Sequence, residues 1–194
     1  MIKHRYQDLI EIFHRSFYQQ YQTRLVKGDD EPVYLVGDSN SAEQEKRDHQ
    51  IVFAHGYYAS GLHEISHWLV AGRERRKLED FGYWYQPDGR TTAEQAVFEQ
   101  VEVKPQAMEW LLCAAAGFDF NVSCDNLSGE ATDRVAFQGK VHQRVLDLLH
   151  RGAGRRAEQL IGALTDFYQN PLPLTPEQFT FDGQLNLVKE PCHA

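Results

Sequence analysis

The chain has 194 residues, with 20 Lys and Arg against 28 Asp and Glu, a formal net charge of −8, and 42% hydrophobic residues. This length and this apolar share fit one globular domain and exclude a disordered or fibrous protein. The acidic balance argues against nucleic acid as a direct partner, because binding to the phosphate backbone needs a basic surface.

The first half of the chain is predicted to alternate helices and short strands. Apolar and aromatic residues between Tyr6 and Tyr21 recur at steps of three and four, which predicts an amphipathic helix. Pro32–Val36 and Ile51–Ala54 are short β-branched runs and therefore predicted strands, and the polar run 38–48 between them predicts an exposed loop. A helix is expected from about Ser60 to about Gly72.

An aromatic run and a helix start follow. Phe81–Tyr85 is followed by turn residues, which predicts a strand that enters a turn. Thr91 and Glu94 fit a capping box, so a helix should begin there. Pro105 leaves two arrangements open, because it either kinks one long helix that reaches Gly117 or occupies the first turn of a second helix.

The remaining segments complete the predicted fold. The alternation from Val101 to Lys104 also permits a short strand, so two structures are open for that segment. Asp133–Arg151 and Arg156–Tyr168 have helical periodicity, and the proline-rich tail from Pro171 is expected to be wrapped or loose. Together these elements predict an α+β fold dominated by helices with a small β-sheet, in which residues 1–194 form a single domain.

The least charged stretch runs from His49 to Gly72, where Glu64 is the only Asp, Glu, Lys or Arg. Its histidines and Glu64 would be costly in lipid, so the stretch predicts buried interior and no membrane span. The N-terminus has no secretory signal, and a cytoplasmic protein is therefore expected. The three cysteines lack C-x-x-C spacing, which disfavours a disulfide framework and a thiolate zinc site.

The sequence His63-Glu64-Ile65-Ser66-His67 is an H-E-x-x-H motif on the helix expected there. At about 100° per residue, its two histidines lie on one face a single turn apart, so both imidazoles can reach one metal ion. Glu64 lies beside that face and can contact a metal-bound water without being a ligand. Core histidines satisfied by hydrogen bonds are the alternative, but burying three such polar groups without a common partner is unfavourable. A metal-binding helix is therefore predicted.

A site held by two histidines needs a third protein ligand, which an Asp or Glu on a neighbouring element commonly supplies. The candidates are Glu99, Glu102 and Glu109, and Glu102 is preferred because Val101 and Val103 flank it and a buried carboxylate needs a cation. By spacing alone, an ordinary solvated helix carboxylate is an equal alternative for Glu102. Glu99 could orient a ligand from one turn away, and we interpret Glu109 as a solvated helix carboxylate.

Two chemistries share this set of residues. With Zn²⁺, Glu64 would be the general base of a peptidase or other hydrolase. With Fe²⁺, two histidines and one carboxylate leave open positions for O₂ and substrate, as in a non-haem oxygenase. The ligand types do not choose between the two metals, and the H-E-x-x-H motif alone favours the hydrolase.

Longer blocks of sequence surround the motif. They are residues 23–32 (TRLVKGDDEP), 51–68 (IVFAHGYYASGLHEISHW), 80–90 (DFGYWYQPDGR), 98–107 (FEQVEVKPQA) and 121–126 (NVSCDN). Together and in this order they resemble the bacterial elongation factor P hydroxylase family. The resemblance extends from about residue 6 to about residue 182, and blocks of this length are far more specific than H-E-x-x-H alone.

The resemblance implies an enzyme that hydroxylates the β-lysylated lysine of elongation factor P and consumes molecular oxygen. It also implies a metal held by His63 and His67 of the H-E-x-x-H motif and by Glu102 of the Val-Glu-Val-Lys-Pro sequence. Hydroxylation of a C–H bond needs a redox-active metal, so Fe²⁺ is expected and Glu64 becomes an orienting or proton-handling residue. The zinc hydrolase with Glu64 as general base stays as the alternative.

The implied substrate offers a long cationic side chain, which suggests a narrow pocket with an apolar wall and a carboxylate at its end. Asp119 or Asp125 could supply the charge. The aromatic residues that could form the wall are Tyr57, Tyr58, Trp68 and Tyr83–Tyr85, although core packing is the alternative for each of them. The run Gly152–Ala157 mimics a dinucleotide fingerprint but follows a helical pattern, so no nicotinamide or flavin site is predicted.

Overall fold

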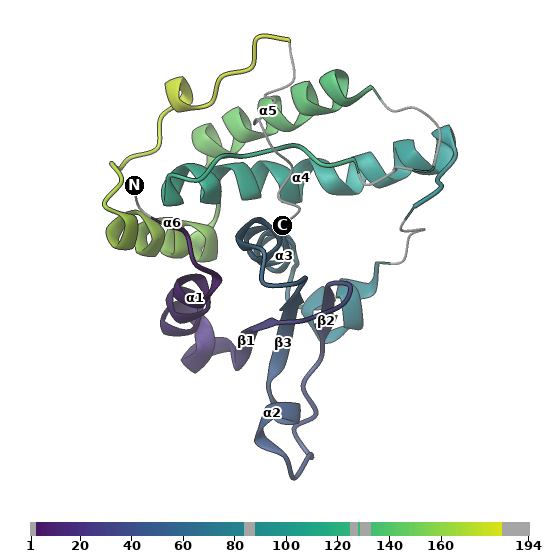
Figure 1. The fold of residues 1–194 in the computed structure, drawn as a ribbon, viewed down its shortest axis with the longest axis vertical. Coiled ribbons are helices and arrows are strands. Elements are labelled where there is room, and N and C mark those ends of the chain that lie inside the picture. Colours follow the sequence, from purple (N-terminus) through teal and green to yellow (C-terminus); the bar gives the residue numbers. More distant parts are fainter. Residues whose placement is uncertain (1–2, 84–87, 125–127, 129–132, 184–194) are drawn as a thin grey trace.

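The computed structural model describes residues 3–83, 88–124, 128 and 133–183, and the structural statements below concern these residues. The fold is α+β with helices dominating, as predicted (Figure 1). The elements are α1 (Tyr6–Tyr21), β1 (Thr23–Lys27), β2 (Val33–Leu35), α2 (Gln44–Arg47), β3 (His49–Phe53), α3 (Tyr58–Val70), α4 (Thr92–Ala116), α5 (Arg134–Arg151) and α6 (Arg155–Tyr168), with 3₁₀ turns at Arg75–Lys77, Glu79–Gly82 and Pro176–Gln178.

Helix α3 occupies the middle of the molecule. It packs on β3 on one side and on α4 on the other, while α5 lies across α4 from α3 and α6 packs against both α4 and α1 (Figure 1). The β2–β3 connection, which carries the short helix α2, projects away from the helices (Figure 1). A single cluster of buried apolar residues connects α1, the sheet and helices α3, α4, α5 and α6. This arrangement places the H-E-x-x-H helix against α4.

The three strands form one sheet in the order β1-β3-β2, with β1 parallel and β2 antiparallel to β3. Strands β2 and β3 were expected, but β1 was not predicted. Its alternation buries Thr23 and Leu25, while the long cationic side chains between and after them obscure the apolar pattern. The Leu25 N–H donates to His14 Nε2 at 3.2 Å, so α1 covers part of the outer edge of β1.

The predicted strand at Phe81–Tyr85 is wrong over its first residues, which form the end of a 3₁₀ turn. Asp80 and Phe81 have φ of 45° and 57°, and Gly82 has φ of 69°, so three consecutive residues are left-handed. The turn stacks the Phe81 ring on Tyr34 of β2 at 4.3 Å, and Asp80 Oδ1 accepts the Tyr34 N–H at 2.9 Å. These tertiary contacts override the strand propensity of the aromatic run. Positions 84–85 lie outside the described residues.

Helix α4 is one long helix with Pro105 inside it, so the alternative of a single helix is confirmed and the strand at 101–104 is wrong. The Thr91 N–H donates to Glu94 Oε2 at 2.9 Å in the predicted capping box, and the helix ends at Gly117 with φ of 66°. Proline removes one helical hydrogen bond. Packing against α3, α5 and α6 holds the helix together across this position.

Basic side chains hold the end of the H-E-x-x-H helix. Arg156 of α6 donates to the backbone oxygens of Trp68 at 3.0 Å, Leu69 at 3.0 Å and Ala71 at 2.8 Å. Arg76 also donates to the Ala71 oxygen, at 2.6 Å. The last carbonyls of a helix lack helical partners and carry partial negative charge, so both guanidinium groups stabilise this end of α3.

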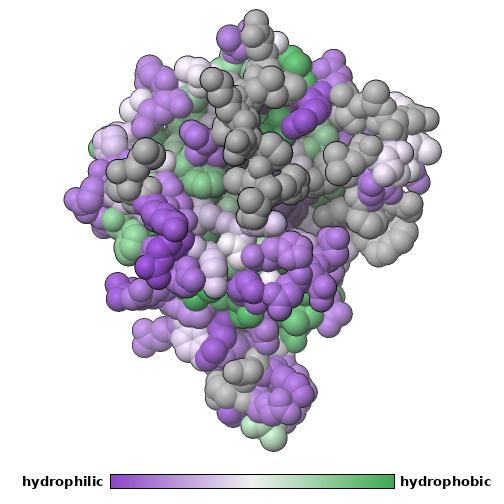
Figure 2. Space-filling view, in the orientation of Figure 1, coloured by the Kyte–Doolittle hydropathy of each residue, from purple (hydrophilic) through white to green (hydrophobic). Residues whose placement is uncertain are grey.

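The coloured residues in Figure 2 are mostly hydrophilic, and the hydrophobic ones among them form only small separate areas (Figure 2). Within the described part of the chain, no helix combines the length and the apolar character that a membrane crossing requires.

Candidate metal centre

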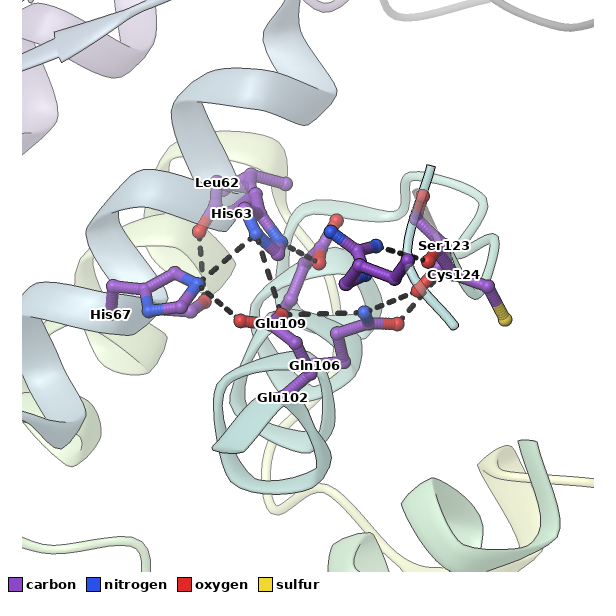
Figure 3. Close-up of polar contacts among 10 residues, drawn as sticks. Leu62, His63, His67, Glu102, Gln106, Glu109, Ser123 and Cys124 are labelled. Carbon is purple, nitrogen blue, oxygen red and sulfur yellow. Dashed lines mark hydrogen bonds and ion pairs between the residues drawn. The ribbon is translucent and has the colours of Figure 1, made fainter. Parts of the chain in front are cut away.

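The structure brings together the three residues predicted as metal ligands. His63 and His67 project from α3 towards Glu102 of α4 (Figure 3). The two imidazole Nε2 atoms are 3.1 Å apart. Glu102 Oε1 lies 3.3 Å from His67 Nε2, and Glu102 Oε2 lies 3.7 Å from His63 Nε2. The i, i+4 spacing of the histidines and the continuity of α4 through Pro105 produce this convergence.

The cluster has the dimensions of a metal site. One ligand atom from each of the three residues lies within 4.8 Å of the others. Two nitrogens bound at right angles to one ion, each at about 2.1 Å, are about 3.0 Å apart, which is close to the observed separation of the imidazoles. Glu102 is only 1% exposed, and its Oε1 accepts no hydrogen bond from the described part of the protein. Because an unsatisfied buried carboxylate oxygen is unfavourable, the cluster is suited to a cation.

Electrostatics prepare Glu102 to bind a cation. Burial alone would raise the pKa of Glu102, but the neighbouring imidazoles of His67 and His63 lower that pKa to about 2. Burial alone would lower the pKa of His63, yet Glu109 and Glu102 raise it well above the usual value of 6.5. Glu102 is therefore an anionic oxygen donor at neutral pH, whereas His63 must release a proton before it can bind a metal ion.

Glu109 is the first site residue that the sequence interpretation missed. It is 7% exposed, and its Oε2 lies 2.8 Å from His63 Nδ1, so the reading of Glu109 as a solvated carboxylate is wrong. A continuous α4 brings positions 102 and 109 to the same side, seven residues apart, and the uncertainty over Pro105 had hidden this relation. Glu99, the residue expected to orient a ligand, instead pairs with Lys140 at 3.2 Å.

Gln106 is the second missed residue. It is fully buried, and its side-chain amide exchanges two hydrogen bonds with the backbone of Ser123, donating at 2.6 Å and accepting at 3.0 Å. The same Nε2 lies 3.4 Å from Glu102 Oε2 (Figure 3). The spacing of Glu102, Gln106 and Glu109 at i, i+4 and i+7 is the signal that could have identified both missed residues.

Buried polar groups also fix the chain next to Ser123. Arg90 is 1% exposed and donates to the Cys124 oxygen at 2.9 Å and to Gln95 Oε1 at 2.8 Å. Gln95 Nε2 donates to the same Cys124 oxygen at 3.1 Å. Ser123 and Cys124 are therefore anchored on α4 and on Arg90, beside the candidate metal centre.

A cavity of about 680 Å³ opens onto the two imidazoles. The carboxylate-bearing side chains of Glu31, Glu64, Asp80 and Glu109 contribute to its wall, and no Lys or Arg does so among the described residues. Glu64 thus lies beside the histidine pair and faces the cavity side, as its position in the motif predicts. The other lining residues are Pro32, Ala59, Ser60, His63, His67, Phe81, Tyr83, Val101, Asn121 and Ser123.

The predicted substrate pocket differs in detail from this cavity. Tyr83 lines it, whereas Tyr58 and Trp68 are buried in the hydrophobic core and Tyr57 is not among the lining residues. Asp119 is exposed and does not contribute to the cavity wall, so the charge comes from other carboxylates. Trp84, Tyr85 and Asp125 lie outside the described residues.

The fold and the site define an α+β protein in which two histidines of one helix and a buried glutamate of another form a candidate metal centre beside a cavity. The family model for elongation factor P hydroxylase matches residues 12–179. The elongation factor P lysine hydroxylase of Haemophilus influenzae is 52% identical over 167 residues, which cover 86% of this chain and 91% of that protein. The chain therefore belongs to the elongation factor P hydroxylase family and is an enzyme, which confirms the resemblance.

Proposed function

We propose that this chain is a metal-dependent oxygenase that hydroxylates the β-lysylated lysine of elongation factor P. The convergence of His63, His67 and Glu102 beside the cavity carries the proposal. The name of the similar Haemophilus influenzae protein supplies the hydroxylated partner and the lysine. The β-lysyl group on that lysine follows from the resemblance of the sequence to the family.

The donor set supports a ferrous ion as the metal. Two imidazole nitrogens and one carboxylate oxygen that converge on one point are the donor types of non-haem iron oxygenases. Bound Fe²⁺ supplies the redox chemistry with O₂ that C–H hydroxylation requires and that redox-inert Zn²⁺ lacks. His63, His67 and Glu102 would hold the ion in this proposal, and both histidines also line the cavity.

Glu64 is proposed to hold or orient a proton beside the reacting group. Its side chain contributes to the cavity wall and belongs to the same helical turn as the two imidazoles. Burial raises the pKa of Glu64 above its usual value, so this carboxyl keeps a proton more readily than an exposed glutamate. These properties suit proton handling, and they differ from those of Glu102, whose pKa is about 2.

The charge of the cavity supports a cationic substrate side chain. Glu31 and Asp80 are both exposed carboxylates, and they contribute to the same cavity wall as Glu64. Opposite charge favours entry of an ammonium group, while Tyr83, which is only partly buried, provides apolar surface for methylene groups. A lysine lengthened by a β-lysyl group has both features.

The proposal is tested by incubating protein loaded with Fe²⁺ under anaerobic conditions with β-lysylated elongation factor P, an electron donor and O₂. Mass spectrometry should show the gain of one oxygen atom on the modified lysine. Protein loaded with Zn²⁺ is the matched control and should leave the partner unchanged. A partner that gains no oxygen from fully iron-loaded enzyme would refute the proposed function.

A zinc hydrolase is the second candidate, favoured by the position of Glu64 within the H-E-x-x-H motif and in the cavity wall. In that case the Zn²⁺-loaded protein cleaves an amide bond without O₂, and Glu64→Gln abolishes cleavage while metal stays bound. A requirement for O₂ and activity only with iron would exclude this candidate.

A further inference from the structure

Helix α4 carries more of the metal centre than one ligand. Glu102, Gln106 and Glu109 follow one another at i, i+4 and i+7, and all three are buried between α4 and its neighbours. Gln106 and Glu109 each contact a residue that is predicted to bind the metal. Gln106 contacts Glu102 on the same helix, and Glu109 contacts His63 on the helix opposite.

The contact between Glu109 and His63 fixes which ring nitrogen of the imidazole carries the N–H. An ionised carboxylate has no proton to donate, so the 2.8 Å hydrogen bond requires a proton on His63 Nδ1. In the neutral ring the remaining nitrogen, Nε2, then has a free lone pair. That atom is the one that lies 3.1 Å from His67 Nε2, at the convergence point of the cluster. Glu109 therefore selects the nitrogen that can bind a metal and fixes the plane of the ring.

The contact between Gln106 and Glu102 distinguishes the two carboxylate oxygens. Glu102 Oε2 receives the Gln106 amide at 3.4 Å, while Oε1 has no donor in the described part of the protein and lies 3.3 Å from His67 Nε2. The side-chain amide of Gln106 cannot flip without losing hydrogen bonds, because its nitrogen donates to the Ser123 oxygen and its oxygen accepts the Ser123 N–H. The amide therefore presents an N–H to Oε2 and leaves Oε1 as the oxygen for the cation.

We propose that Glu109 and Gln106 are positioning residues that decide which atoms of His63 and Glu102 bind the metal ion. Glu109 binds Nδ1 of His63 and so leaves Nε2 for the metal ion. Gln106 binds Oε2 of Glu102 and so leaves Oε1 for the metal ion. The proposal rests on the proposed function, because it needs a metal at this cluster. It assigns a role to two residues of α4 that lie outside the H-E-x-x-H motif and that the predicted ligand set does not contain.

Metal affinity tests the proposal without an activity assay. Anaerobic calorimetry with Fe²⁺ should show that Glu109→Leu and Gln106→Leu each weaken binding by about 10- to 100-fold. Glu109→Gln should recover much of the lost affinity, because an amide oxygen can still accept the Nδ1 proton. Glu99→Leu is the matched control, since Glu99 lies on the same helix but pairs with Lys140, and its affinity should stay at the wild-type value.

A spectroscopic measurement separates positioning from a merely structural role. In wild-type protein loaded with diamagnetic Zn²⁺, nitrogen NMR should find the His63 proton on Nδ1 and the metal on Nε2, and Glu109→Gln should keep this tautomer. Metal on Nδ1, or wild-type affinity in folded Glu109→Leu and Gln106→Leu proteins, would overturn the proposal and leave the proposed function standing. A wild-type protein that binds no metal would overturn both.

Discussion

The end of α3 offers a prediction that can be worked out from the structure. Arg156→Leu removes the donor to the carbonyl oxygens of Trp68 and Leu69, whereas Ala71 keeps its hydrogen bond from Arg76. All three hydrogen bonds from Arg156 are lost, but only the Trp68 and Leu69 oxygens lose their guanidinium donor; each of these two bonds has a net value of about 1–1.5 kcal/mol, because solvent screens the partly exposed Arg156. The free energy of unfolding should therefore fall by about 2–3 kcal/mol, and the melting temperature by roughly 4–12 °C.

The same substitution should also weaken metal binding, because His67 belongs to the turn that Arg156 stabilises. The Ala71 N–H donates to the His67 oxygen at 2.9 Å, so a frayed helix end loosens the backbone of this residue. Urea denaturation followed by circular dichroism measures the free energy of unfolding. The control is Arg155→Leu, which changes the neighbouring exposed arginine. A stability within about 0.5 kcal/mol of the wild type would refute the reasoning, because surface changes have effects of that size.

Three further predictions concern the site. His67→Ala should abolish stoichiometric metal binding measured by elemental analysis while the circular dichroism spectrum stays native; retention of the metal would contradict the assigned ligand set. Because the pKa of His63 is raised above 6.5 in the metal-free protein, a proton competes with the metal at this residue, and the metal affinity should keep rising as the pH rises above 6.5. Calorimetry in buffers of different ionisation enthalpy should detect the released proton. A metal affinity that does not change with pH above 6.5 would count against this coupling. Glu31→Gln should raise KM for the cationic substrate by about two- to fivefold with kcat unchanged, as expected for an exposed ion pair, and an unchanged KM would remove Glu31 from substrate binding.

The predictable part of this site is the part that local sequence encodes. Histidines four positions apart share a helical face wherever the helix lies, so the pairing of His63 and His67 needs no tertiary information. Glu102 could be selected because an acidic residue between two valines is unusual on a solvated surface. The helices over 6–21, 134–151 and 155–168 follow from apolar periodicity in the same way, within a residue or two at their ends.

The missed features depend on contacts between distant segments. Strand β1 exists because β3 pairs with it, and the left-handed turn at Asp80 exists because Phe81 packs on Tyr34. Glu109 could not be assigned to the site without knowing that α4 continues through Pro105. A proline directly after the alternating segment Val101–Lys104 favours a break locally, and burial against three other helices outweighs that preference.

The left-handed turn at 80–82 has a consequence for how this cavity can evolve. Phe81 and Gly82 hold backbone angles that ordinary side chains adopt at a cost of about 1–3 kcal/mol each, and the Phe81 ring is committed to the core. Substitutions in the turn at 80–82 should therefore reduce stability in two ways, through backbone strain and through lost packing. Glu31, which lines the same cavity, is exposed and carries neither constraint. Relatives whose cavity accepts a substrate side chain of a different shape should differ first at Glu31 and keep the turn at 80–82 unchanged.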